Sequence, residues 1–149
     1  MVAIKTDPRV FAVMLGGVRS PVRAAEELAA DIAFWSARRY GIWTVRAARA
    51  GAFLGLTGFM DRPDGRGVAL RFAFWPKVQG QGLAREAAFA ALRFGHDQAG
   101  LSRVIAVARE SNVGSRTVLG GIGMRVADAF EQGGHRMILY ESLRASDRP

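Results

Sequence analysis

The alternation of apolar and polar positions predicts a strand, a turn and a helix near the middle of the chain. Residues 68–75 are an apolar run typical of a strand, and Pro76 ends it because proline has no N–H for a ladder. Gly80 and Gly82 follow within a few residues. From Leu83 to about residue 98, apolar positions repeat at helical spacing. The sequence therefore predicts a glycine-rich turn between a strand and a helix.

The chain before this region predicts one long helix and a hairpin. Val2–Lys5 are consistent with a short edge strand, and Asp7-Pro8 with a helix start. The strands at residues 42–47 and 52–59 join the central strand in a three-stranded meander. Ser20-Pro21 begin the long helix, in which Glu27 and Asp31 lie off the predicted apolar face of Ala25, Leu28, Ile32 and Trp35.

The chain behind the central helix predicts a strand, a short helix and a final hairpin. Residues 103–108 are typical of a buried strand. Because a helix connects them, this strand and residues 68–75 are expected to be parallel. Ser111-Asn112 begin the short helix, and residues 124–130 and 136–140 form the last two strands.

Composition limits the class of protein. The chain has 149 residues, 50% of them apolar and 23% charged, which indicates one domain over residues 1–149. It has no cysteine, and its two histidines lie far apart in sequence, so no metal site is expected. The apolar runs are too short to span a membrane and no secretory signal is visible, which favours a cytoplasmic protein.

The formal net charge of +8 favours an anionic partner. Nucleic acid, a membrane surface and a polyanionic small molecule all fit this charge. The arginines are scattered along the chain, and only Lys5 and Lys77 are lysines. Scattered arginine is more typical of a solvated surface, so a basic nucleic-acid binder is the minor alternative.

The glycine-rich turn is a candidate phosphate site. A turn at a helix start aims unpaired backbone N–H groups and the positive end of the helix dipole at one point. A dinucleotide fingerprint would need a third glycine where Arg85 stands, and no Gly-Lys-Ser/Thr triplet of a P-loop exists. What remains is Gln79-x-x-Gly82-x-Ala84. The alternative is an ordinary turn between a strand and a helix.

This turn resembles the Q/R-x-x-G-x-G/A pyrophosphate loop of the GNAT superfamily of acyl-coenzyme A N-acyltransferases. Three further fragments, in the correct order, resemble its ribosomal-protein N-terminal acetyltransferase-like branch. The likeness spans roughly residues 16 to 143, and the fragments are Gly41–Val45, Gly51–Gly58 and Asn112–Met124.

The resemblance implies an α+β fold: a mixed, mostly antiparallel sheet, splayed around a central parallel strand pair, with helices on both faces. It implies an enzyme that moves an acetyl group from acetyl-coenzyme A to a primary amine by direct attack. The acceptor would be a protein N-terminus, an amino acid or a small amine. The opening strand of the family is short or missing here, and an uncovered edge favours a homodimer.

The resemblance also implies roles for individual site residues. It implies no bound metal. Ser115 is the candidate donor of a proton to the departing thiolate. Trp43 and Arg71 are candidates for substrate binding; the alternatives are a core aromatic and a buried, paired arginine. Trp35 and Trp75 would wall the same pocket if they face it. The residues expected to bind coenzyme A are Phe72, Ala73, Phe74, Gln79, Gly80, Gln81, Gly82, Leu83, Ala84, Arg85, Asn112 and Ser115.

Structural alternatives stand beside these roles. Asn112 is an ordinary helix cap by position, Ser115 can cap or meet solvent, and Gln79 can simply shape the turn. The carboxylate base of many relatives is absent. Glu110, Asp61 or a chain of waters could replace it, or a low-pKa amine could react without a base. A fold that binds coenzyme A with little or no turnover is therefore the second candidate function.

Overall fold

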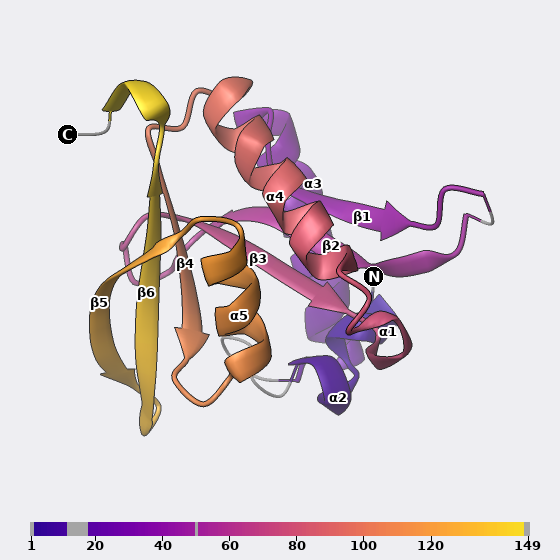
Figure 1. Cartoon of the computed structure of the whole chain (residues 1–149). Coiled ribbons are helices and arrows are strands. Elements are labelled where there is room, and N and C mark those ends of the chain that lie inside the picture. The colour runs from indigo at the N-terminus through magenta and orange to yellow at the C-terminus, as the bar shows by residue number, and fades with distance from the viewer. Residues whose placement is uncertain (1, 12–17, 50, 148–149) are drawn as a thin grey trace.

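Six strands form one mixed sheet, in the order β1-β2-β3-β4-β6-β5, in the computed structural model, which describes residues 2–11, 18–49 and 51–147. Figure 1 shows α4 and α5 in front of this sheet and α3 behind it. The strands are β1 (Ile42–Arg46), β2 (Phe53–Asp61), β3 (Val68–Phe74), β4 (Arg103–Arg109), β5 (Arg125–Gln132) and β6 (His135–Leu143). The helices are α1 (Val2–Lys5), α2 (Pro8–Phe11), α3 (Pro21–Arg38), α4 (Leu83–Asp97) and α5 (Val113–Gly121), with 3-10 turns η1 (Pro76–Val78) and η2 (Ala145–Asp147).

The predicted parallel pair is confirmed, and its two strands separate along their length. β2 pairs antiparallel with β3 through seven residue pairs, from Asp61 and Val68 to Gly55 and Phe74. β3 pairs with β4 at one position only, Ala69 with Ile105. Because the pairing is confined to the start of both strands, the later part of β3 diverges from β4. The predicted sheet, splayed around a central parallel pair, is therefore present.

The side chains of β3 alternate between two cores. Leu70 belongs to the larger core, in which it packs with Ala88 of α4. Ala73 points to the other face and packs with Ile4 of α1 and Val10 of α2. Alternate residues of a strand point to opposite faces, so α4 covers one face of β3, while α1 and α2 cover the other.

Residues Val2–Lys5 form helix α1, so the predicted short edge strand is wrong. The adjacent residues Ile4 and Lys5 are 0% and 1% exposed. Adjacent side chains of a strand point to opposite faces, whereas adjacent side chains of a helix can both lie on its covered side. Lys5 is neutralised there by Glu27 and Asp31 of α3, at 3.1 and 3.2 Å. In the described parts of the chain β1 pairs with β2 alone, and the predicted homodimer stays a prediction.

Helix α3 turns a somewhat different face inward than its apolar pattern predicts. Leu28 and Trp35 are partly buried as expected, but Ile32 is 61% exposed. Glu27 and Asp31 point inward instead, because the buried ammonium group on α1 needs anionic partners. The requirement to pair a buried charge therefore sets the rotation of this helix.

The ion pairs of Glu27 predict a dependence of stability on pH. Burial alone would raise the pKa of Glu27, but hydrogen bonds from Lys5 and Arg19 lower it below its usual value of 4.5. A carboxyl with a lowered pKa contributes stability above its unfolded pKa, and this contribution is lost as the pH falls through the folded pKa. We expect the free energy of unfolding to fall below about pH 4.5, and less steeply in Glu27→Gln. Urea unfolding across this range measures both slopes, and identical slopes would contradict the assignment.

Candidate active site

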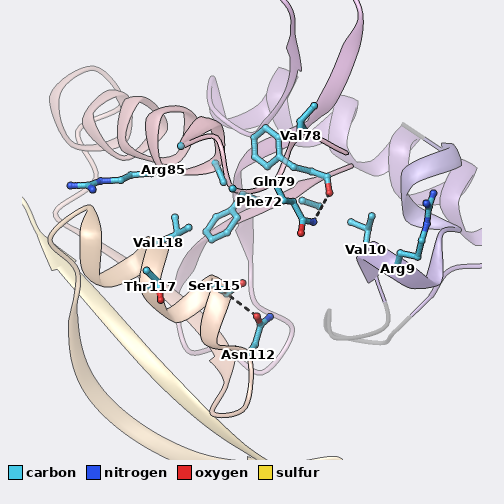
Figure 2. A pocket seen from close by; sticks show the side chains of 16 residues that line it. Arg9, Val10, Phe72, Val78, Gln79, Arg85, Asn112, Ser115, Thr117 and Val118 are labelled. Carbon is cyan, nitrogen blue, oxygen red and sulfur yellow. Dashed lines mark hydrogen bonds between the residues drawn. The ribbon is translucent and has the colours of Figure 1, made fainter. Parts of the chain in front are cut away.

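A cleft of about 590 Å³ opens where β3 and β4 diverge. Figure 2 shows side chains from four places in the sequence around it: α2, the end of β3, the loop before α4, and α5. Ligand pockets in proteins commonly have a volume of roughly 300–1,000 Å³. The cleft is therefore large enough for a ligand of substantial size.

The loop between β3 and α4 has the backbone that its glycines predict. Gly80 and Gly82 have φ angles of +81° and +77°, in the left-handed region that favours glycine. Gln79 lies just before them and donates its side-chain amide to the Phe74 carbonyl at 3.0 Å. This hydrogen bond joins the loop to the end of β3. Gln79 therefore helps to shape the turn, which is the structural role considered for it above.

The loop delivers the N-terminus of α4 to the cleft. Gly82 is the N-cap, and the first helical hydrogen bond runs from the Glu86 N–H to the Gly82 carbonyl, at 3.0 Å. The N–H groups of residues 83–85 therefore have no acceptor within the helix. The Arg85 side chain lies against α5, since a Cβ added at Gly121 would be 3.4 Å from its Nε. Backbone N–H groups, the helix dipole and a guanidinium together favour an anion here.

The opposite wall of the cleft is formed by β3 and α5. Phe72, Ala73 and Phe74 line the cleft along the stretch where β3 has left β4, so backbone groups there can pair with an extended ligand. Asn112 caps α5 by accepting the Ser115 N–H at 3.2 Å, and both residues line the cleft. The cap uses the oxygen of the Asn112 side chain, so its NH₂ group remains the donor that a ligand could meet.

The cleft brings together ten of the twelve residues predicted to bind coenzyme A. Gln81 and Leu83 are not among the lining residues. The Gln81 side chain turns back to the Lys77 carbonyl at 3.3 Å, and Leu83 is half-buried at the start of α4. Glycine spacing locates the turn, but it does not decide which side chains of the turn point away from the cleft.

Sequence reasoning missed six of the lining residues. Four of them follow from their neighbours, because they lie on the predicted loop and on the helix of Ser115: Val78, Gly114, Thr117 and Val118. Arg9 and Val10 have no such signal, since α2 reaches the cleft only through the tertiary fold.

The two residues predicted to bind substrate do not line this cleft. Trp43 packs edge-to-face with Trp35 and Phe94, at centroid distances of 5.0 and 5.1 Å. Arg71 lies on the face of β3 away from α4, with Nη1 3.3 Å from the Met60 sulfur. Burial and the charge of Arg19 lower the pKa of Arg71. Their role with substrate stays a prediction.

The described residues that line the cleft include no carboxylate. Glu110 is paired with Arg136 at 2.9 Å, and Asp61 with Arg38 at 3.0 Å, both outside the cleft. The polar groups that line the cleft are backbone groups, the hydroxyls of Ser115 and Thr117, the amides of Gln79 and Asn112, and the guanidinium groups of Arg9 and Arg85.

The described residues contain no cluster of three or more histidine, cysteine, aspartate or glutamate side chains that could hold a metal ion. His96 has a structural environment, with its ring nitrogens 2.7 Å from the Leu101 carbonyl and 2.9 Å from the Ser142 hydroxyl. None of the helices formed by these residues has the length and apolar character needed to cross a bilayer.

The chain is similar to known proteins of one family. Residues 1–125 match the acetyltransferase (GNAT) domain family. A putative GNAT-family acetyltransferase from Bordetella pertussis superposes with a TM-score of 0.77 at 27% identity, over 83% of this chain and 77% of that one. An acetyltransferase of the GNAT family from Bacillus anthracis gives 0.80 at 23% identity, over 97% and 87% of the two chains.

A ribosomal-protein acetyltransferase is also among the structural neighbours. RimL, a ribosomal L7/L12 α-N-protein acetyltransferase solved in complex with coenzyme A, superposes with a TM-score of 0.73. Its identity to this chain is 15%, and the superposition covers 87% of this chain and 76% of RimL. At this identity the likeness establishes the fold, so the predicted architecture is confirmed.

Proposed function

Because the chain belongs to the acetyltransferase (GNAT) domain family, we propose that it transfers an acetyl group from acetyl-coenzyme A to a primary amine. The enzyme class follows from the family; the amine and the residues that act on it are the proposal. We take residues 1–149 as one catalytic domain. The observation that carries the proposal is the cleft, in which a glycine turn at a helix N-terminus lies beside a strand that has left its neighbour.

The loop fits the pyrophosphate of coenzyme A. A Cβ added at Gly80 or at Gly82 would meet no other atom within 4 Å, so there is open space in front of the loop. The N–H groups of residues 80–85 would hold the pyrophosphate in that space, as they do for anions at other helix starts. The pantetheine arm would then run along the backbone of residues 72–74, and the Asn112 amide would donate to it.

The proposed reaction is direct attack of a neutral amine on the thioester. A bond forms from nitrogen to the acetyl carbon as the carbon–sulfur bond breaks. A backbone N–H near Phe74 would polarise the carbonyl. The nitrogen releases a proton to solvent, and the departing thiolate takes one from the Ser115 hydroxyl, which solvent restores. No step needs a metal ion or a second cofactor.

The absence of a carboxylate from the described lining favours an acceptor with a low pKa. At about pH 7.5, an α-amino group of pKa about 7.8 is roughly one-third neutral, whereas an alkylamine of pKa about 10.4 is roughly 0.1% neutral. A protein N-terminus can therefore react without a base far more readily than an alkylamine can. RimL is named for acetylation of a protein α-amino group, which is consistent with this preference.

The test is release of free thiol from acetyl-coenzyme A across a panel of amines. The panel contains a peptide with a free N-terminus, a free amino acid and a polyamine, with calorimetry of acetyl-coenzyme A alongside. Turnover with an α-amine supports the proposal. Binding of acetyl-coenzyme A without turnover on any amine would favour the alternative function, a module that only binds coenzyme A. Absence of binding would reject both.

Ser115→Ala is expected to lower kcat roughly a hundredfold, as loss of a proton donor commonly does, and to leave KM for acetyl-coenzyme A nearly unchanged. The helix cap should survive, because Ser115 contributes its backbone N–H to it and not its hydroxyl. Ser111→Ala is the control, since Ser111 is exposed and does not line the cleft. Equal kcat values in the two variants would assign the Ser115 hydroxyl a structural role.

A further inference from the structure

A cluster of charged side chains is buried behind the sheet, on the side of β3 that α4 does not cover. Lys5 and Arg19 are 1% and 5% exposed. Glu27 contacts both cations, with Lys5 Nζ at 3.1 Å from Oε2 and Arg19 Nε at 2.9 Å from Oε1. Asp31, one helical turn further along α3, contacts Lys5 at 3.2 Å. Glu27 therefore joins two cations that lie fourteen positions apart in sequence.

The two cations also meet through the backbone. The Arg19 N–H donates to the Lys5 carbonyl at 2.9 Å, so the chain leaves this point at Lys5 and returns to it at Arg19. Helix α2 (Pro8–Phe11) belongs to the segment that this contact closes. The ion pairs with Glu27 and the backbone hydrogen bond together fix both ends of that segment on α3.

Helix α2 contributes directly to the cleft. Arg9 and Val10 both line it, on the side opposite Arg85 (Figure 2). Val10 is 6% exposed and packs with Ile4 and Ala73, so α2 is held against β3 by apolar contacts as well. Two sets of contacts thus support this wall of the cleft. One is the apolar packing of Val10, and the other is the pairing of Lys5 and Arg19, at the two ends of the segment that contains α2, with Glu27.

On the premise that the cleft binds acetyl-coenzyme A, we propose that Glu27 is a positioning residue for the cofactor cleft. Glu27 touches neither the cleft nor its proposed ligand. It holds Lys5 and Arg19 together, and through them it holds α2 where Arg9 and Val10 complete the cleft.

The charge balance of the cluster makes Glu27 the sensitive member. Glu27 forms ion pairs with Lys5, Arg19 and Arg23, at 3.1, 2.9 and 3.7 Å, whereas Asp31 contacts Lys5. Removing the charge of Glu27 takes away the carboxylate that Lys5 and Arg19 share. The two buried cations would then repel one another more strongly, and the loss of an ion-pair partner by a buried charge is strongly unfavourable. The segment that carries α2 is expected to move away from β3.

The test compares Glu27→Gln with Glu26→Gln, the same chemical change on an exposed neighbour of the same helix. We measure acetyl-coenzyme A affinity by calorimetry, amide hydrogen exchange by mass spectrometry, and steady-state kinetics. In Glu27→Gln we expect affinity to fall roughly threefold to thirtyfold, the usual range for residues coupled to a distant site. Exchange should speed up in residues 8–11 but not in β4, and kcat at saturating cofactor should stay close to wild type. Glu26→Gln should match wild type throughout.

A second pair of variants covers the case in which Glu27→Gln does not fold. Asp31→Asn leaves Glu27 in contact with both cations, so it should fold and give a smaller change in the same direction. Glu27→Asp keeps the charge on a shorter side chain and should restore part of the affinity that Glu27→Gln loses.

Two results would overturn the inference, and they differ from failure of the proposed function. One is unchanged affinity in a folded Glu27→Gln protein, or in Asp31→Asn if Glu27→Gln does not fold. The other is lost affinity with unchanged exchange in residues 8–11, because Glu27 would then act on the cleft by a route other than α2. If wild-type protein fails to bind acetyl-coenzyme A, the proposed function itself is wrong and this inference falls with it.

Discussion

Gly82→Val is expected to weaken the affinity for acetyl-coenzyme A by at least about a hundredfold, because two helix-start contacts to a phosphate are worth roughly 3 kcal/mol or more. Gly82 has φ +77° as the N-cap of α4, a conformation that a β-branched residue avoids. The loop would have to change its backbone, which would turn the N–H groups of residues 83–85 away from the cleft. The valine side chain would also enter the open space in which the pyrophosphate is proposed to lie.

Gly65→Val is the matched control for this prediction. Gly65 has φ +74°, and a Cβ added there also meets no other atom within 4 Å. It lies in the turn between β2 and β3 and does not line the cleft. Both variants should therefore lose similar stability, while calorimetry should detect lost affinity in Gly82→Val alone. Equal affinities in the two variants would remove the phosphate role from the glycine turn.

Gly58→Ala is expected to destabilise the protein by about 3–5 kcal/mol, in the range reserved for severe steric or core defects. A Cβ at Gly58 would lie 2.1 Å from the Gly41 carbonyl oxygen and 2.7 Å from the Ile42 Cα. Both are backbone atoms, so neither can rotate away as a side chain would. Gly58 pairs with Ile42 at the start of β1. The substitution would therefore force β1 away from β2.

Gly67→Ala separates this clash from the cost of the backbone angle. Gly67 has φ +141°, close to the +144° of Gly58, but its added Cβ would approach nothing closer than 3.5 Å. Its cost should be limited to about 1–3 kcal/mol of conformational strain. Urea unfolding of both variants gives the difference. If Gly58→Ala were no less stable than Gly67→Ala, β1 would tolerate displacement at this position.

Much of the fold was predictable because its signals are local. The turn at Gly80 and Gly82 follows from glycines placed between an apolar run and a helical repeat. The parallel pairing of β3 with β4 follows from the helix between them. The start of α5 at Asn112 follows from the preference of asparagine for the cap position, and its side chain makes that hydrogen bond.

The features that were missed depend on partners far apart in sequence. Nothing near Lys5 indicates that α3 supplies carboxylates for it, so Val2–Lys5 resembled a strand and Ile32 resembled a core residue. The same limit hid the contribution of Arg9 and Val10 to the cleft. Buried ion pairs with Lys5 set the inward face of α3, and contacts with Ile4 and Ala73 set Val10, and the apolar periodicity of one segment carries no information about either.

In the candidate site, too, residues with local signals were predicted and residues placed by the tertiary fold were not. Ten predicted residues surround the cleft, because they lie on two short stretches whose conformation is set locally. The predictions for Trp43 and Arg71 rest on residue type, and type alone does not tell where in the sheet, or on which face of it, a side chain lies. Trp43 faces Phe94 of α4, while Arg71 points to the opposite side of the sheet.

The single residue pair between β3 and β4 has a mechanical consequence. The β1-β2-β3 half and the β4-β6-β5 half of the sheet share one backbone pairing, Ala69 with Ile105, and are otherwise held together by side chains of a common core. A ligand that contacts β3 and α5 would add bonds between the two halves where the ladder makes none. We therefore expect bound ligand to raise the stability of the protein by holding the two halves together.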